Sequence, residues 1–487
     1  REEVKTFMDL FVQNDRDNSG EIDAQELLSI LTYLGFSIEK TILDAVVKEV
    51  DVNASNSINE REFITCMRKV RDLEVAKIKK VMEAADLDGS GTVSFDEIET
   101  VLRAVGFRWV DPDAVAEIVA ACGFNVSKFD GGLSELWQIL VIYREREGFV
   151  ASEAKEFDDA FRRYDKGNTG EMNVLELGKL LRWLGFPCPY EIQKQLVAKV
   201  DFDNSGKINS PELRKLIRMY QGRDLQALYE AFTQRDEEGL GCLPREKCKE
   251  VLEEVDCEGA MELLPDLAVD DSGEFSVSLP ILTKAFVMHK RSMRAAFRVN
   301  SGFSTAEVEE LKGVFRKYDA DGSGDIGNSE LVPLIEDAFP SWAHDPAMRP
   351  TLVQLMQEVD ADGSGSLDFQ DFVSLMLQFQ DLQHKEHIEQ ERRAVEQTSF
   401  APREVEEFRE LFLASGTGHD LMSASAVRHM IGNICPMGDR NATELNGIIA
   451  DVLAASRPTE SSSSGLKFPE FLILMHKLLE VDFAGIQ

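Results

Sequence analysis

Residues 15–26 read DRDNSGEIDAQE, and this stretch decides the fold because its oxygen-bearing residues follow a fixed spacing. Oxygen donors stand at positions 1, 3, 5, 7 and 12 of the stretch: Asp15, Asp17, Ser19, Glu21 and Glu26. Gly20 at position 6 allows a sharp bend, and Ile22 at position 8 is apolar. Side-chain oxygens at 1, 3 and 5, a backbone carbonyl at 7 and a two-oxygen grip at 12 form the ligand set of a calcium loop.

The same spacing recurs along the chain in loops that begin at Asp15, Asp51, Asp86, Asp165, Asp201, Asp319 and Asp360. The first three starts lie 36 and 35 residues apart, and amphipathic helical segments separate the loops. This pattern resembles the EF-hand superfamily, with a layout like calmodulin repeated in tandem. The resemblance implies an all-α fold of helix–loop–helix lobes, in which short antiparallel β bridges join paired loops.

The apolar residue at position 8 sets the phase of further, eroded copies. The predicted position-8 residues are Ile22, Ile58, Val93, Leu133, Met172, Ile208, Leu243, Phe275, Ile326, Leu367, Leu421 and Leu466. Hands form pairs, because a single hand leaves its apolar helical face and its loop strand uncovered. We therefore expect about twelve hands in six lobes, at residues 1–71, 72–148, 149–221, 222–300, 301–382 and 399–487.

Four loops carry every expected ligand and are predicted to bind Ca²⁺. Their ligand residues are Asp15, Asp17, Ser19, Glu21 and Glu26; Asp86, Asp88, Ser90, Thr92 and Glu97; Asp201, Asp203, Ser205, Lys207 and Glu212; and Asp319, Asp321, Ser323, Asp325 and Glu330. Lys207 is acceptable because position 7 binds through its carbonyl.

Three loops are expected to bind more weakly. Their candidate ligands are Asp51, Asn53, Ser55, Ser57 and Glu62; Asp165, Thr169, Glu171 and Glu176; and Asp360, Asp362, Ser364, Ser366 and Asp371. Asn56 replaces the bend glycine of the first, which is tolerable because Asn enters the left-handed region. Gly167 removes one ligand from the second. The third ends in Asp371, whose shorter carboxylate makes the two-oxygen grip harder and favours Mg²⁺.

The other five loops are predicted to be degenerate. The predicted residues at their positions 1 and 12 are Val126 and Trp137; Asp236 and Lys247; Ala268 and Leu279; Ala414 and Ser425; and Thr459 and Glu470. The first, third and fifth lobes should therefore hold two binding loops each and the second lobe one. The fourth and sixth should hold none and serve as scaffold.

The balance of charge bounds the partners. The formal net charge is −35, from 88 acidic and 53 basic residues. Phosphates of nucleic acids and anionic lipid surfaces would be repelled. The composition favours divalent cations and protein partners that present basic or amphipathic helices, and it leaves the oligomeric state open. No run of 18 apolar residues occurs, so no transmembrane segment is expected.

Cysteine usage bears on the compartment. The seven cysteines are scattered, odd in number and without a CxxC pair, which indicates neither zinc knuckles nor a disulfide framework. We expect a cytoplasmic protein, with a cytoskeletal or ciliary assembly as a narrower alternative. The chain starts at Arg1 with neither an initiator methionine nor a signal peptide, which is compatible with a fragment of a longer protein.

Motifs outside the loops point to no catalysis, and we do not expect an enzyme. His384 and His387 are expected on a solvated helix face. Residues 281–299 are basic and amphipathic. They are expected to be the exit helix of the eighth hand, or alternatively a helix that occupies the groove of a neighbouring lobe.

Three functions fit the repeats. The first is a calcium sensor or adaptor, whose helix angles change on calcium binding so that lobes engage partner helices. The second is a structural component of a cytoskeletal or ciliary assembly that holds partners constitutively. The third is a calcium buffer, which ranks last because buffering alone would not favour keeping five degenerate loops.

Overall fold

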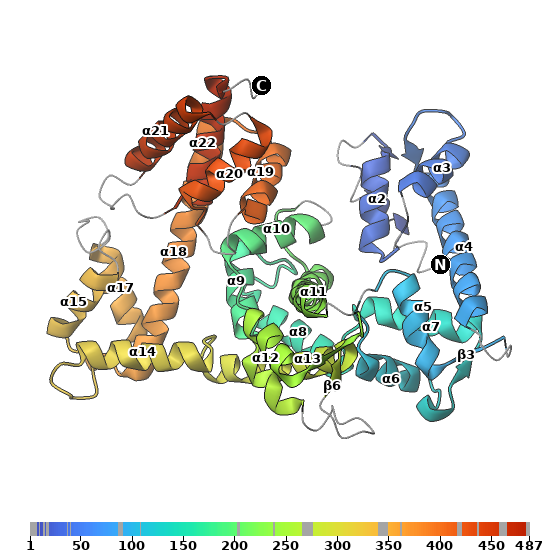
Figure 1. Cartoon of the computed structure of the whole chain (residues 1–487), viewed down its shortest axis with the longest axis horizontal. Coiled ribbons are helices and arrows are strands. Elements are labelled where there is room, and N and C mark those ends of the chain that lie inside the picture. Colours follow the sequence, from blue (N-terminus) through green and yellow to red (C-terminus); the bar gives the residue numbers. More distant parts are fainter. Residues whose placement is uncertain are drawn as a thin grey trace. The chain divides into compact units, whose positions relative to one another are not determined.

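A computed structural model describes most of the chain (Figure 1). The described residues are 7–8, 10–12, 15, 19–36, 38, 40–85, 91–107, 109–201, 205–236, 239–264, 276–338, 349–360, 363–415, 421–435, 438–456 and 465–483. They form two compact units, Arg1–Asn173 with Leu196–His289, and Val174–Gln195 with Lys290–Gln487.

Helices dominate both units, and this confirms the expected all-α fold. Elements of the first unit are β1 (Glu21–Ile22), α2 (Ala24–Tyr33), α3 (Lys40–Val50), β2 (Ile58–Asn59), α4 (Glu60–Ala85), β3 (Val93–Ser94), α5 (Phe95–Ala104), α6 (Pro112–Ala121), η1 (Val126–Lys128), β4 (Asp130–Gly131), α7 (Leu133–Glu145), α8 (Ala151–Tyr164), α11 (Ser210–Arg235), β5 (Cys242–Pro244), α12 (Arg245–Glu254), η2 (Glu258–Leu263) and β6 (Ser276–Ser278). Elements of the second unit are α9 (Val174–Trp183), α14 (Thr305–Tyr318), α15 (Asn328–Ala338), α17 (Arg349–Val359), α18 (Phe369–Thr398), α19 (Pro402–Ser415), α20 (Ala424–Ile434), α21 (Asp439–Ser456) and α22 (Phe468–Glu480). Helices α10 (Tyr190–Val200) and α13 (Leu279–Val299) contribute residues to both units.

Short antiparallel pairings join the loops two by two. The paired residues are Ile22 with Ile58, Val93 with Gly131, Leu243 with Val277, Met172 with Ile208, Ile326 with Leu367, and Met422 with Leu466. A helix begins two residues after each of these twelve residues. The paired residue is therefore position 8 of its loop, and the exit helix starts at position 10.

This register corrects three of the predicted position-8 residues. The pairing residue is Gly131 rather than Leu133, Val277 rather than Phe275, and Met422 rather than Leu421. Phe275 itself lies outside the described residues. The ends of these loops move accordingly, to Phe124 and Glu135, Asp270 and Ile281, and Ser415 and Ala426.

Gly131 could not be found as an apolar position because it has no side chain. A Cβ atom at Gly131 would lie 2.4 Å from Cζ of Phe129, so the Phe129 ring already fills that space. Phe129 is itself buried and belongs to the apolar cluster around Val93 and Ile98. The ring thus supplies, from two residues earlier, the apolar group that position 8 provides in other loops.

Five of the six loop pairs sit on apolar clusters of described residues. Around the first pair, Ile22, Leu27, Ile58 and Phe63 are completely buried, and the Phe11 and Phe63 ring centroids lie 5.4 Å apart. Full burial of each such side chain stabilises the fold by about 1.5–3 kcal/mol. Comparable clusters surround Val93 and Leu243 in the first unit, and Ile326 and Leu466 in the second.

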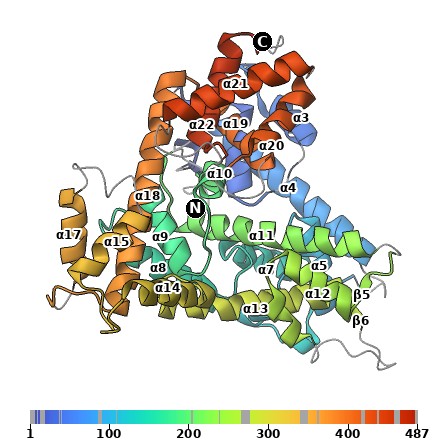
Figure 2. The same ribbon diagram turned by 60° about the vertical axis from the view of Figure 1, so that its left-hand side comes forward.

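The long helix α18 organises the second unit. It packs against α9, α14, α17 and α22, as both views show (Figures 1 and 2).

The expectation of a solvated face is wrong for His387, whose side chain is only 15% exposed and whose Nε2 lies 2.7 Å from Oε1 of Glu191. Glu191 also contacts Arg409 of α19, which is completely buried.

Helix α13 starts directly after β6 and is therefore an exit helix, as expected. Its C-terminal half also contacts a segment about one hundred residues earlier in the chain. The Arg294 guanidinium lies 5.0 Å from the ring centroid of Phe186, and that of Arg298 lies 5.6 Å from Trp183. The second half of α13 thus packs on the end of α9 and the residues that follow it, and the occupation of a neighbouring lobe's groove stays a prediction.

Candidate metal centres

In the six candidate loops whose first residue is described, that residue organises the loop backbone. One carboxylate oxygen of Asp15 accepts the Ser19 N–H at 2.9 Å and the other accepts the Gly20 N–H at 2.8 Å. The carboxylates of Asp51, Asp165, Asp201, Asp319 and Asp360 accept the N–H groups of the corresponding two residues in the same way. These bonds close the loop around the carboxylate. The N–H groups of Gly170 and Thr169 also lower the pKa of Asp165, which favours the charged form that a cation needs.

The bend at position 6 has the expected left-handed backbone. The φ angle is 78° at Gly20, 72° at Gly206 and 89° at Gly324. Asn56 has a φ angle of 61°, so asparagine does take the place of glycine there. The loop that begins at Asp51 therefore keeps the geometry of the others.

The last ligand is attached to the start of the exit helix. Oε2 of Glu330 accepts the Gly327 N–H at 2.9 Å, and its Oε1 accepts the Ala320 N–H at 2.9 Å. Glu62 makes the same two bonds, and Glu26, Glu97 and Glu212 accept the N–H of the residue three before them. The carboxylate at position 12 thus lies in the first turn of its helix, so any displacement of the carboxylate acts on that helix.

The loop from Asp319 shows the most complete cluster. One oxygen from each of Asp319, Asp321 and Glu330 lies within 4.8 Å of the others. The Ser323 hydroxyl donates to the Asp325 carbonyl at 2.9 Å, so the ligands at positions 5 and 7 are also adjacent. A hydrogen bond from Ser323 lowers the pKa of Asp321. Carboxylate, hydroxyl and carbonyl oxygens suit hard divalent cations, and this donor set fits Ca²⁺.

Several predicted ligands cannot be placed. Asp17, Asp86, Asp88, Ser90, Asp203 and Asp362 lie outside the described residues. Thr92 and Glu97 of the third loop are described, and Glu97 accepts the Ser94 N–H at 2.8 Å. In the tenth loop, Asp368 caps α18 and accepts the Asp371 N–H at 2.8 Å. The ligand assignments therefore remain predictions for the loops as wholes.

Position 7 links the two loops of a pair. Lys207 Nζ lies 2.8 Å from Oε2 of Glu171 across the third pair, and the Ser57 hydroxyl donates to Glu21 across the first. Both contacts use side chains that leave the position-7 carbonyl available. Sequence reasoning considered only the carbonyl oxygen at position 7. The structure shows that the position-7 side chains also connect the two loops of a pair.

The seventh loop is closed by a cation of its own. Asp236 accepts the N–H groups of Leu240 and Gly241 at 2.9 and 2.8 Å, as in the loops above. At position 12, where an acid is expected, the Lys247 ammonium donates to the Arg235 carbonyl at 2.9 Å. The predicted first and last residues of this loop, Asp236 and Lys247, are therefore in the correct frame. The Lys247 ammonium places a positive charge beside the loop.

Sequence reasoning missed one acid at position 12. In the corrected frame of the fourth loop this residue is Glu135. A hydrogen bond from the Ser134 hydroxyl lowers the pKa of Glu135, and a weaker contribution comes from a backbone hydrogen bond from Gly132. Positions 1, 3 and 5 are Phe124, Val126 and Lys128, which offer no carboxylate. Its signal was the Gly-Gly-Leu-Ser-Glu sequence, in which Glu follows the strand by four residues.

Comparisons with known proteins agree with this geometry. A model of the EF-hand domain pair matches residues 5–68 and 308–377, and a model of the single EF hand matches residues 78–102. Within the described residues, no helix is long and apolar enough to cross a bilayer.

Two of three similar curated proteins are named as calcium-binding proteins. A 16 kDa calcium-binding protein of Schistosoma mansoni is 30% identical over 106 residues, which are 21% of this chain and 73% of that protein. An uncharacterized calcium-binding protein of Caenorhabditis elegans is 31% identical over 22% of this chain and 48% of its own length. A troponin C isoallergen of Blattella germanica is 29% identical over 31% of this chain and 93% of its own length. Taken with the paired helix–loop–helix units, these matches show that the chain is a calcium-binding protein of the EF-hand superfamily.

Proposed function

We propose that the protein is a multi-lobe calcium sensor or adaptor. Calcium in the loops from Asp15, Asp86, Asp201 and Asp319 would change helix angles and let those lobes engage basic or amphipathic helices of a partner protein. The loops from Asp51, Asp165 and Asp360 would bind more weakly, and the last would also accept Mg²⁺. The six lobes proposed from the sequence are the working units of this function.

One observation carries the proposal, the attachment of Glu330 and its equivalents to the first turn of the exit helix. In the present structure Glu330 bonds to backbone N–H groups at both ends of its loop. An ion that takes both carboxylate oxygens must compete with these bonds and move the carboxylate. Because Leu331 and Leu334 on the same helix are buried, that motion is transmitted to the apolar cluster beneath.

The experiment is a calcium titration of the full chain in the presence of an apolar dye. Glu330→Gln should remove one calcium-binding step and reduce the dye response, because the amide cannot give a two-oxygen charged grip. Glu407→Gln, at an exposed position of α19, is the matched control and should leave both unchanged. Equal titrations for Glu330→Gln and the unsubstituted chain would refute the sensor mechanism at this loop.

A structural role is the second candidate, and one observation favours it. The fourth pair has a closed apolar cluster around Leu243 and Val277, and its seventh loop carries Lys247 in place of an acid. Such a lobe would hold a partner with or without calcium, as in a cytoskeletal or ciliary assembly of the cytoplasm. Pull-down from a source lysate with calcium and with chelator separates the two roles, because constitutive partners persist in chelator. A pure buffer would capture no partner in either condition.

A further inference from the structure

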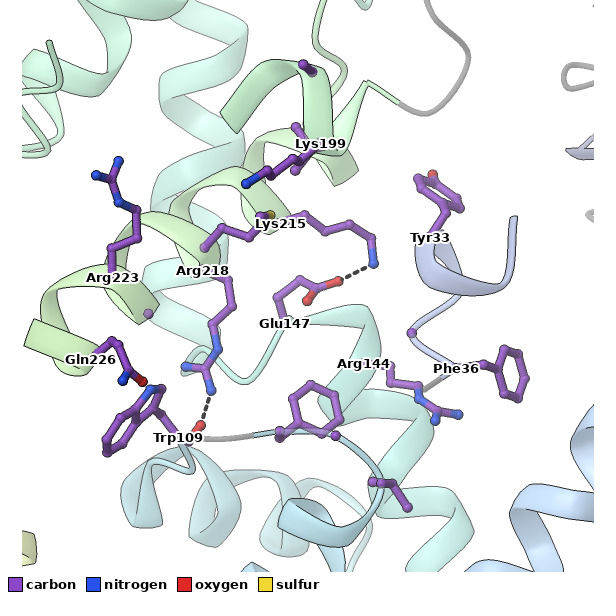
Figure 3. Close-up of a pocket in the computed structure, with 18 of the residues that line it drawn as sticks. Tyr33, Phe36, Trp109, Arg144, Glu147, Lys199, Lys215, Arg218, Arg223 and Gln226 are labelled. Carbon is purple, nitrogen blue, oxygen red and sulfur yellow. Dashed lines mark hydrogen bonds and ion pairs between the residues drawn. The ribbon is translucent and has the colours of Figure 1, made fainter. Parts of the chain in front are cut away.

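A large open cavity in the first unit differs in charge from the rest of the protein. It has a volume of about 1130 Å³ and lies between the C-terminal end of α2, residues 105–107 with Trp109, the ends of α7 and α10, and helix α11 (Figure 3). We call it the basic groove. Pockets for single small molecules generally span about 300–1,000 Å³. This size and openness suit several side chains of a peptide better than one small metabolite.

Aromatic side chains line the basic groove. Tyr33, Phe36, Phe107 and Trp109 are all partly exposed there. Figure 3 shows Tyr33 and Phe36 on one side of the groove and Trp109 on the other. The Trp109 and Tyr229 ring centroids lie 6.3 Å apart, which supports the indole from behind. Half-buried aromatic rings are the usual anchors of protein interfaces.

Cations outnumber acids along the groove. Its lining contains five basic residues and three acidic ones, and Glu74, which pairs with the lining residue Arg144, reduces the excess to one positive charge in a chain of net charge −35. The basic residues are Arg144, Lys199, Lys215, Arg218 and Arg223. The acidic residues are Glu147, Asp201 and Glu230. At physiological ionic strength the screening length is about 8 Å, so a ligand in the groove responds mainly to these nearby charges.

Two ion pairs and one hydrogen bond hold three of these cations in the wall. Arg144 donates to both carboxylate oxygens of Glu74 and lies 4.8 Å from the Phe36 ring centroid. Lys215 Nζ lies 2.8 Å from Glu147 and 5.3 Å from the Tyr33 ring centroid. Arg218 donates to the Trp109 carbonyl. These bonds hold the aromatic and basic groups in one surface, and Lys199 and Arg223 lie exposed at its rim.

We propose that the basic groove binds an acidic amphipathic helix of a partner protein. Apolar residues of that helix would contact Phe36, Phe107 and Trp109, while its carboxylates would meet Lys199 and Arg223. This preference is opposite to that of the calcium-opened lobes, which would take basic helices. One chain could therefore hold two partners of opposite charge at separate surfaces.

The test uses the full chain in saturating calcium and three fluorescein-labelled peptides of 18 residues. The first carries a Leu/Phe stripe with Glu at its polar positions, the second has Lys in place of every Glu, and the third keeps Glu but replaces the apolar stripe with Gly and Ser. Fluorescence anisotropy should show that the first peptide binds at least ten-fold more tightly than the third.

Charge reversal locates the site. The double variant K199E/R223E should weaken the first peptide at least ten-fold and leave the second peptide's affinity for the calcium-loaded lobes unchanged. The matched control is K249E/R403E, which makes the same change in net charge at two exposed helical positions of other helices. It should alter neither affinity by more than two-fold. Circular dichroism and a thermal melt check that both variants fold.

Three results would overturn the proposal. They are no binding of the first peptide at 1 mM, equal weakening by the two double variants, and equal binding of the first and third peptides. Equal binding would mean that the groove recognises negative charge alone, as a nucleic acid or polyphosphate would supply. Because the second peptide reports on the calcium-opened lobes, its behaviour tests the proposed sensor function separately.

Discussion

Replacing Arg409 by methionine should loosen the second unit more than any surface change. The Arg409 guanidinium is completely buried and contacts Glu191 and Glu391, whose side chains are 1% and 11% exposed. It also lies 4.2 Å from the Phe468 ring centroid. Arg409→Met keeps much of the stack on Phe468 but removes the arginine cation from two buried carboxylates, of which Glu191 keeps its contact with His387.

The expected loss of stability follows from that geometry. Removing one partner of a buried ion pair costs about 3–5 kcal/mol, because the remaining charge stays desolvated. About 1.4 kcal/mol corresponds to a tenfold change in an equilibrium constant, so the population of the locally opened state should rise roughly 10²- to 4 × 10³-fold. The effect should be local to α10, α18 and α19, which meet at Arg409.

Hydrogen exchange measured by mass spectrometry is the appropriate assay, because a chain of many lobes does not unfold in two states. Peptides from α10, α18 and α19 should lose protection in Arg409→Met. Arg403→Met on the same helix is the control, since Arg403 is 80% exposed and, among the described residues, forms an ion pair with the exposed Glu407. Such surface pairs contribute about 0–1 kcal/mol.

A second substitution tests the cause. Glu191→Gln removes one of the uncompensated charges, so Arg409→Met with Glu191→Gln should regain part of the protection. Exchange in Arg409→Met within two-fold of that in Arg403→Met would refute the reasoning. So would a double variant that is less protected than the sum of its parts.

Three further predictions concern single side chains. Burial raises the pKa of Glu406 to about 7 from an ordinary value near 4.5, so its protonated form stabilises the fold fully below about pH 4.5, and this contribution is lost as the pH rises through 7. The thermal midpoint should therefore decrease as the pH rises from 5 to 8. Glu406→Gln should make the thermal midpoint less dependent on pH over this range. Asn56→Ala forces alanine into a φ angle of 61°, which costs about 1–2 kcal/mol. Calorimetry should therefore show roughly ten-fold weaker calcium binding at the loop from Asp51. Asn56→Gly is the control and should not weaken calcium binding there. Asp371→Glu lengthens the last ligand of the loop from Asp360 by one methylene, and competition titrations should show a gain in calcium over magnesium preference; an unchanged preference would contradict the role assigned to this residue.

Loops that keep both an apolar residue at position 8 and an acid at position 12 could be phased correctly from sequence. Ile22, Ile58, Met172 and Ile326 each precede that acid by four residues, and each one pairs as predicted. Where the acid is lost, several apolar neighbours compete, as Leu421 does with Met422. Gly131 gave no apolar signal at all, because the Phe129 ring occupies its space.

Contacts distant in sequence were beyond prediction for a different reason. Glu191, Glu391 and Arg409 are ordinary surface residues by composition, and their helices alternate charged and apolar residues like many solvated helices. Only packing of α18 and α19 on α10 buries them together. The basic groove likewise collects residues from segments as far apart as Tyr33 and Arg223, so no local pattern announces it.

The ammonium of Lys247 is tethered by its own side chain and cannot diffuse away. A chelator that removes calcium from the other loops leaves the positive charge of Lys247 beside the seventh loop. We therefore expect the seventh loop to respond less to a chelator than a loop whose cation can be removed.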